Sequence, residues 1–141
     1  MMYKNRASVM TRITALYVDK IANKVFADIG LSLAQYKILA YLFSHSEADV
    51  TTASLEEHFQ MSHSTSVGLL NNLEKDGWIK REKTVSSGRS KVICASQKAE
   101  SHRDAIRAKG EELEQVFTSN LTREETEQYI LLSKKILGTT D

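Results

Sequence analysis

The hydrophobic period of the chain changes at Gly77. Before it, residues 55–76 place apolar side chains at helical spacing, and Ser62 stands where a helix cap is expected. After it, residues 78–85 alternate, and residues 86–95 contain a turn signal followed by a run typical of a returning strand. We therefore predict two short helices followed directly by a β-hairpin.

Helical spacing also dominates the chain before this segment. Residues 4–29 carry apolar side chains on two faces of a helix that ends at Gly30. Ser32 and Gln35 have the spacing of a capping box and predict a second helix that ends near His45. A helix that is apolar on two sides usually has two packing partners, of which one is expected to be a second subunit.

The remaining helices are predicted from their caps. We expect Thr52 to cap the short third helix, and Ser96 to open a long fifth helix that is interrupted by Gly110. Thr122 and Glu125 form another capping box, which predicts a last helix. The predicted fold is mainly α with a small β-hairpin wing, that is, a winged helix-turn-helix with helical extensions from both ends of the chain.

The charge of the chain is unevenly distributed. Residues 78–98 hold six basic residues and one acidic residue, for a net charge of +5, whereas residues 32–77 have a net charge of −4. A basic hairpin is what a phosphate-binding element needs, although lysines on a hairpin also serve solubility and edge protection.

Other function classes find little support in the composition. No apolar run approaches the roughly 20 residues that span a bilayer, and residues 1–10 lack the pattern of a signal peptide. A single cysteine, Cys94, fits a reducing cytoplasm. Catalytic groupings and clustered metal ligands are not evident, because the four histidines are scattered. We expect a cytoplasmic, non-enzymatic protein without a cofactor, metal site or membrane partner.

Three segments resemble the MarR family of bacterial transcription regulators. Residues 30–39 are similar to the start of that family's second helix, and residues 61–81 to its recognition helix and first wing strand. Gly88–Lys91 matches the wing tip, and the resemblance covers nearly the whole chain. It implies one domain over residues 1–141, with dimerisation helices at about 4–29 and 97–138 around a DNA-binding lobe at about 32–96.

The resemblance also implies a function. Members of the family are homodimers that bind pseudo-palindromic duplex DNA, usually as repressors released by a small ligand. Twofold symmetry would place two recognition helices about one DNA turn apart. The partners implied are therefore double-stranded DNA, a second copy of the chain, and a small-molecule effector of unknown identity.

The candidate DNA contacts lie on the fourth helix and the hairpin. Ser87 stands where the family usually has a wing aspartate, and Gly68 and Asn72 stand where many members are basic. Reading by the fourth helix would then rest on short hydrogen bonds and apolar contacts, including asparagine on adenine, with affinity supplied by the wing. The predicted contacts are Ser62, His63, Ser64, Thr65, Val67, Gly68, Asn71, Asn72, Arg81, Lys83, Arg89 and Lys91.

Several alternatives stay open at this point. Arg81 is expected either to touch phosphate or to pair with Glu74 or Glu82. The nearly neutral fourth helix also suits a winged-helix module that binds protein and not DNA. A weaker hypothesis is a thiol redox switch that works through Cys94.

Overall fold

The computed structural model describes residues 5–83 and 91–139. The chain divides into two compact units, one of Met1–Val25 with Glu111–Asp141 and one of Phe26–Gly110. We call them the terminal unit and the winged unit.

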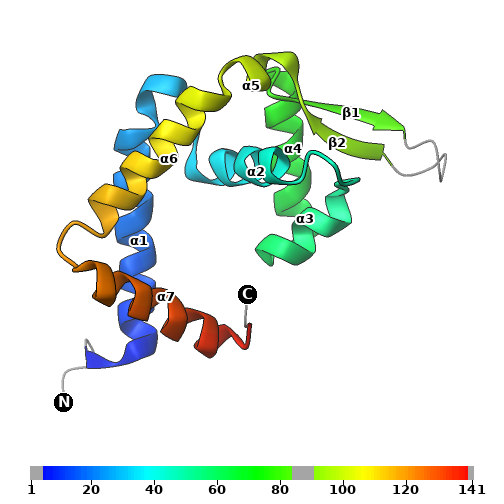
Figure 1. Cartoon of the computed structure of the whole chain (residues 1–141). Helices are drawn as coiled ribbons and strands as arrows, with labels where there is room; N and C mark the ends of the chain where they lie inside the picture. Colours follow the sequence, from blue (N-terminus) through cyan, green and yellow to red (C-terminus); the bar gives the residue numbers. More distant parts are fainter. Residues whose placement is uncertain (1–4, 84–90, 140–141) are drawn as a thin grey trace. The chain divides into compact units, whose positions relative to one another are not determined.

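The described residues are mainly helical, with one two-stranded antiparallel hairpin, as predicted (Figure 1). In chain order the elements are α1 (Ala7–Val25), the 3₁₀ helix η2 (Ala27–Ile29), α2 (Leu33–Ser44), α3 (Thr52–Phe59), α4 (His63–Lys75), β1 (Ile79–Lys83), β2 (Lys91–Ala95), α5 (Gln97–Ser101), α6 (Arg103–Phe117) and α7 (Arg123–Leu137).

Most helix starts follow the predicted caps. Ser32 and Gln35 form a reciprocal capping box at the start of α2, with N–O distances of 3.1 and 3.0 Å. Ser62 accepts from the Thr65 amide at the start of α4, and Thr122 begins α7 with a second capping box. Local hydrogen bonds of this kind are legible in sequence because they join residues only three apart.

Three predicted helix boundaries are wrong. The first helix is expected to reach Gly30, but α1 ends at Val25 and Gly30 caps the separate 3₁₀ helix η2. Thr51, and not Thr52, caps α3, because Thr51 and Ser54 satisfy each other's backbone amides as a capping box. The predicted long fifth helix is broken at His102 and not at Gly110. The His102 ring nitrogen Nδ1 lies 2.8 Å from the Lys98 carbonyl oxygen and so competes for an acceptor at the end of α5.

Gly110 lies inside α6 for a packing reason. A Cβ atom at this position would collide with the ring and hydroxyl of Tyr36 on α2. The Tyr36 ring stacks on Phe26 with 4.7 Å between centroids, so it is held from its other face. The glycine therefore permits the close approach of α2 and α6 within the winged unit.

A single apolar core fixes the position of α4. Its buried face carries Ser66, Leu70 and Leu73, whereas Val67 is 38% exposed. Figure 1 shows α2, α3 and α4 grouped together, with the hairpin extending from them. The core consists of Leu31, Ile38, Leu39, Leu42, Phe43, Val50, Leu55, Leu70, Leu73, Trp78, Ile79, Ile93, Ala99 and Ile106.

The hairpin is tied to this core at its base. Ile79 pairs with Ala95 in the antiparallel register, and the Ile93 amide donates to the Val50 carbonyl at 2.7 Å. Trp78, directly before β1, is buried. The base of the hairpin is therefore held against the core.

The terminal unit keeps much apolar surface exposed. The rings of Tyr17, Phe117 and Tyr129 join α1, α6 and α7, with centroid distances of 6.4 and 6.2 Å. None of the helices within residues 5–83 and 91–139 is long and apolar enough to span a bilayer. The exposed large apolar side chains of this unit are Met10, Ile13, Leu16, Tyr17, Val116, Leu121, Tyr129, Ile130, Leu131, Leu132, Ile136 and Leu137.

The substitution Gly110→Ala tests the packing of α2 on α6. We expect it to lower the free energy of unfolding by about 1–3 kcal/mol, because overpacking against Tyr36 outweighs the gain in helix propensity. Gly68→Ala is the matched control, since no atom lies within 4 Å of the added Cβ, and it should stabilise by about 0.5–1 kcal/mol. Urea unfolding followed by circular dichroism measures both, and a Gly110→Ala protein at least as stable as the parent would contradict the packing argument.

Candidate nucleic-acid interface

The exposed face of α4 gathers most of the predicted contacts. The buried face packs on the core, so the opposite face is left to solvent along the whole helix. Every predicted contact at the helix cap and on the helix is exposed: Ser62, His63, Ser64, Thr65, Val67, Gly68, Asn71 and Asn72. This face presents hydroxyl, amide and methyl groups, which are suited to reading base edges in a major groove.

A carboxylate on α3 braces the start of α4. The Glu56 oxygen Oε2 accepts a hydrogen bond from the Ser66 hydroxyl and lies 2.8 Å from Nδ1 of His63. The Ser66 hydroxyl also lies 2.9 Å from the His63 carbonyl oxygen, and Ser66 is only 1% exposed. These contacts cross the turn between α3 and α4 and fix the angle at which α4 begins.

Sequence reasoning missed the part that Glu56 plays. A signal for it exists in the sequence, because Ser66 is a polar residue on the buried face of an amphipathic helix. Such a residue needs a hydrogen-bond partner. The partner lies ten residues away on another helix, so spacing alone does not identify it.

The hydrogen bonds lower the pKa of Glu56 below its ordinary value of 4.5. The hydrogen bond from Ser66 contributes most, and the bond from His63 comes next. Both favour the charged carboxylate, which strengthens the brace at neutral pH.

Arg81 joins the hairpin to α4. Its Nη2 donates to Oδ1 of Asn71 at 2.9 Å, and its Nε lies 3.7 Å from Oε1 of Glu74. The Arg81 side chain is 24% exposed. Of the predicted partners, Arg81 therefore contacts Glu74, while Glu82 pairs with Lys80 at 3.0 Å.

The basic residues of the hairpin face different surroundings. Lys91 is exposed at the start of β2. The Lys98 ammonium donates to the Asp76 carbonyl and lies 4.2 Å from the centre of the Trp78 ring, so it is engaged at the base of the hairpin. Arg89 and the side chain of Lys83 lie outside the described residues.

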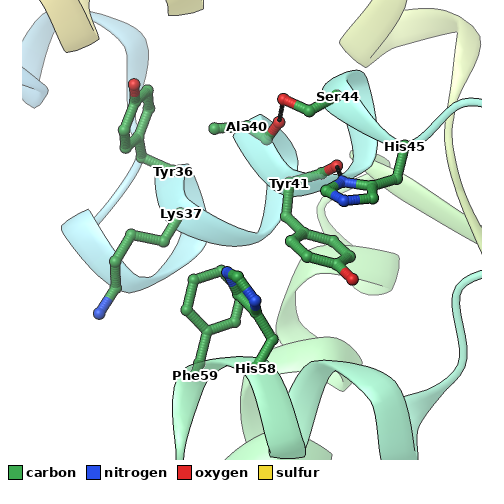
Figure 2. A pocket seen from close by; sticks show the side chains of 8 residues that line it. All are labelled: Tyr36, Lys37, Ala40, Tyr41, Ser44, His45, His58 and Phe59. Atoms are coloured by element: carbon green, nitrogen blue, oxygen red, sulfur yellow. Dashed lines mark hydrogen bonds between the residues drawn. The ribbon is translucent and has the colours of Figure 1, made fainter. Parts of the chain in front are cut away.

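A pocket opens on the winged unit between α2 and α3 (Figure 2). Its volume is about 310 Å³. Figure 2 shows Tyr41 of α2 facing His58 and Phe59 of α3, whereas the Tyr36 ring points away from them. The Ser44 hydroxyl is bonded to the Ala40 carbonyl of its own helix and is unavailable as a donor. The lining residues are Tyr36, Lys37, Ala40, Tyr41, Ser44, His45, His58 and Phe59.

The walls of this pocket are planar rings. Tyr41 stacks on His45 with 3.9 Å between ring centroids, and lies 4.6 Å from His58. His58 meets Phe59 edge-on at 4.7 Å, and the Lys37 ammonium lies 5.7 Å from the Phe59 centroid. The pocket is thus suited to a planar, anionic molecule. In the sequence His45 and His58 are scattered, and their packing against the same Tyr41 ring is not predicted by spacing.

The described residues give less support to a metal site or a reactive cysteine. Within residues 5–83 and 91–139, no group of three or more histidines, cysteines or carboxylates is placed to hold a metal ion. Cys94 is half-buried, and burial together with the nearby Glu82 raises the pKa of its thiol. A raised pKa lowers the fraction of reactive thiolate at neutral pH.

Comparisons with known proteins agree with this geometry. The sequence model of the MarR family matches residues 29–90. MepR from S. aureus, solved as a DNA complex, is 24% identical with a TM-score of 0.84, and the match covers 96% of this chain and 97% of that chain. A mutant of MarR from E. coli, complexed with operator DNA, is 19% identical with a TM-score of 0.83 over 97% of this chain and 99% of that one.

A third solved structure has a similar fold at lower sequence identity. BpsR from Bordetella bronchiseptica, whose DNA binding is regulated by 6-hydroxynicotinic acid, is 13% identical with a TM-score of 0.86, over 96% of each chain. Comparison with curated protein sequences finds no match. The MarR family model thus covers the winged part of this chain, and the predicted winged-helix fold is confirmed.

The pH dependence of stability tests the brace. Because the pKa of Glu56 is lowered in the folded state, its contribution to stability is fully present above the ordinary value of 4.5. It is lost as the pH falls through the lowered pKa. The stability difference between the parent and Glu56→Gln should therefore shrink as the pH falls from 7 to about 3.

Urea unfolding at a series of pH values measures this difference. Glu57→Gln is the matched control, since Glu57 is the exposed neighbour on the same helix. A difference between the parent and Glu56→Gln that stays constant with pH would show that the carboxylate charge does not stabilise the brace.

Proposed function

We propose that this chain is a cytoplasmic transcription regulator of the MarR family that binds a specific duplex DNA site, acting as a repressor and not as an enzyme. The observation that carries the proposal is the exposed face of α4, which is polar over its length while the helix is braced from behind by Glu56 and the core. A rigid helix with short polar side chains suits direct reading of base edges.

The helix and the hairpin have separate tasks in this proposal. Ser64, Thr65, Asn71 and Asn72 read base edges, with Val67 and Gly68 allowing apolar contact and close approach. Ser62 and His63 lie at the N-terminus of α4, where the helix dipole and backbone amides favour a phosphate. Lys83, Arg89 and Lys91 supply phosphate or minor-groove contacts from the hairpin.

We propose further that the protein acts as a homodimer. The support is the apolar surface of the terminal unit, where Leu131, Ile136 and Leu137 are 65%, 77% and 78% exposed. Large exposed apolar side chains that share a surface usually mark an interface. Twofold pairing of this surface makes the bound DNA site a pseudo-palindrome.

The ring-lined pocket between α2 and α3 is our candidate effector site. A planar aromatic acid would stack among Tyr41, His58 and Phe59 and place its acid group near Lys37. Phe59 lies on α3 three residues from Glu56, so an occupant contacts the helix that braces α4. A shift of α3 on binding would loosen the start of the reading helix and release DNA.

Two substitutions separate base reading from phosphate binding. Asn72→Ala should relax the sequence preference at one position of each half-site, because a base contact is lost. It should also weaken the free energy of binding to the preferred duplex by about 1–3 kcal/mol. Arg89→Ala should weaken binding to all duplexes alike and reduce the salt slope by about 1, because a phosphate contact is lost. Fluorescence anisotropy on duplexes enriched from a random library, at two salt concentrations, measures both effects.

The matched control for the base contact is Asn23→Ala on α1, an exposed asparagine of the terminal unit. A folded parent without salt-dependent affinity for any duplex would contradict DNA binding and favour a protein-interaction module. Unchanged DNA binding after peroxide treatment would remove the redox switch through Cys94.

The effector site is tested with 6-hydroxynicotinic acid as the probe. We expect calorimetric titration to show saturable binding, which Lys37→Met weakens by about fivefold, in keeping with a partly exposed ion pair. Lys135→Met, an exposed lysine on α7, should leave binding unchanged. Absence of binding, or equal binding by Lys37→Met and the parent, would contradict the assignment of this pocket to an aromatic acid.

A further inference from the structure

We propose that Arg81 is a positioning residue for Asn71, which it fixes so that the amide NH₂ group reads guanine. The inference rests on the proposed reading of DNA by α4 and replaces the expected phosphate contact of Arg81. It assigns to the first wing strand a part in sequence selection.

The contacts of Arg81 hold the guanidinium against α4. Its Nη2 donates to Oδ1 of Asn71 at 2.9 Å, and its Nε lies 3.7 Å from the Glu74 carboxylate. The Nε atom is buried and has no hydrogen-bond acceptor among the described residues. A guanidinium with a buried nitrogen and a carboxylate beside it is held in place and is poorly placed to reach a phosphate.

Chemistry decides which end of the Asn71 amide faces Arg81. A guanidinium only donates hydrogen bonds, so the atom that it meets must be the amide oxygen. The oxygen is then committed to the protein, and the NH₂ group is the end of the amide left for a ligand. Without Arg81, the side chain at this exposed position would sample several rotamers and both ends of the amide.

An amide fixed in this way selects bases by their acceptors. Guanine presents two acceptors in the major groove, O6 and N7, whereas adenine presents one acceptor and one donor. The two-bond pattern of asparagine on adenine uses the amide oxygen as acceptor. We therefore assign guanine to Asn71 and leave adenine to Asn72, which is exposed one residue further along α4.

A mutant cycle tests the positioning of Asn71. The variants are Arg81→Met, which keeps an apolar stem, Asn71→Ala and the double variant, assayed on duplexes with each base at every position of the selected site. Arg81→Met should lose about tenfold or more of the guanine preference at the position that Asn71→Ala relaxes. The double variant should match Asn71→Ala, and the salt slope should stay at the parent value.

The opposite pattern would overturn the inference. If Arg81→Met weakens binding to all duplexes equally and reduces the salt slope of binding by about 1, Arg81 is a phosphate contact. If the loss of guanine preference in the double variant equals the product of the losses in the two single variants, the two residues act independently. Failure of Asn71→Ala to relax any position, or a preference for adenine there, would also refute it. Asn72→Ala is the matched control and should relax a different position.

A second readout does not depend on DNA. In the free protein, the side-chain NH₂ signals of Asn71 in a ¹⁵N–¹H spectrum should be displaced from the usual asparagine region and return to it in Arg81→Met. The signals of Asn72 should not move. Unaltered Asn71 signals would refute positioning even if DNA binding holds, whereas displaced signals with no DNA binding would refute the proposed function alone. Arg81→Leu, which also keeps an apolar stem without a donor, serves if Arg81→Met does not fold.

Discussion

The geometry of the helix-turn-helix depends on one carboxylate. Glu56 on α3 accepts from the buried Ser66 hydroxyl and contacts the His63 ring near the start of α4, so it ties α4 to the preceding helix. The chain between the two helices passes through Gln60, whose φ of 54° is unusual for a residue other than glycine. The turn and the carboxylate together set the direction of α4, and in the proposed function the exposed face of that helix can read DNA only because its direction is fixed.

Affinity and reading are divided between different elements in the proposed regulator. The exposed side chains of α4 are largely uncharged, and Lys98 and Lys80 are engaged by Trp78 and Glu82 within the winged unit. Among the described basic residues of the strands, Lys91 at the start of β2 is exposed and left for a phosphate. This division explains why a modest overall charge of +1 is compatible with a DNA-binding function. Arg81 connects the two elements, because it is anchored on β1 and contacts the reading face of α4.

Local patterns predicted most of the fold, and long-range contacts account for what they missed. The capping boxes at Ser32 and Thr122 join residues three apart, so their sequence spacing was sufficient. The break at His102 was missed because a side chain competes there with the backbone of α5. The contacts of Glu56 with Ser66 and of Arg81 with Asn71 each join residues ten apart on different elements, which periodicity does not reveal. The exposure of the reading face followed from the helical period alone, whereas the orientation of its side chains did not.

Methylation interference on the preferred duplex tests the central claim most directly. If two copies of α4 read successive major grooves, methylation of purine N7 atoms should block binding in two clusters related by twofold symmetry, with centres about 10–10.5 base pairs apart. The Asn71→Ala variant should lose sensitivity at one guanine in each cluster. A single cluster, or interference confined to minor-groove positions, would contradict a dimer that reads DNA through α4.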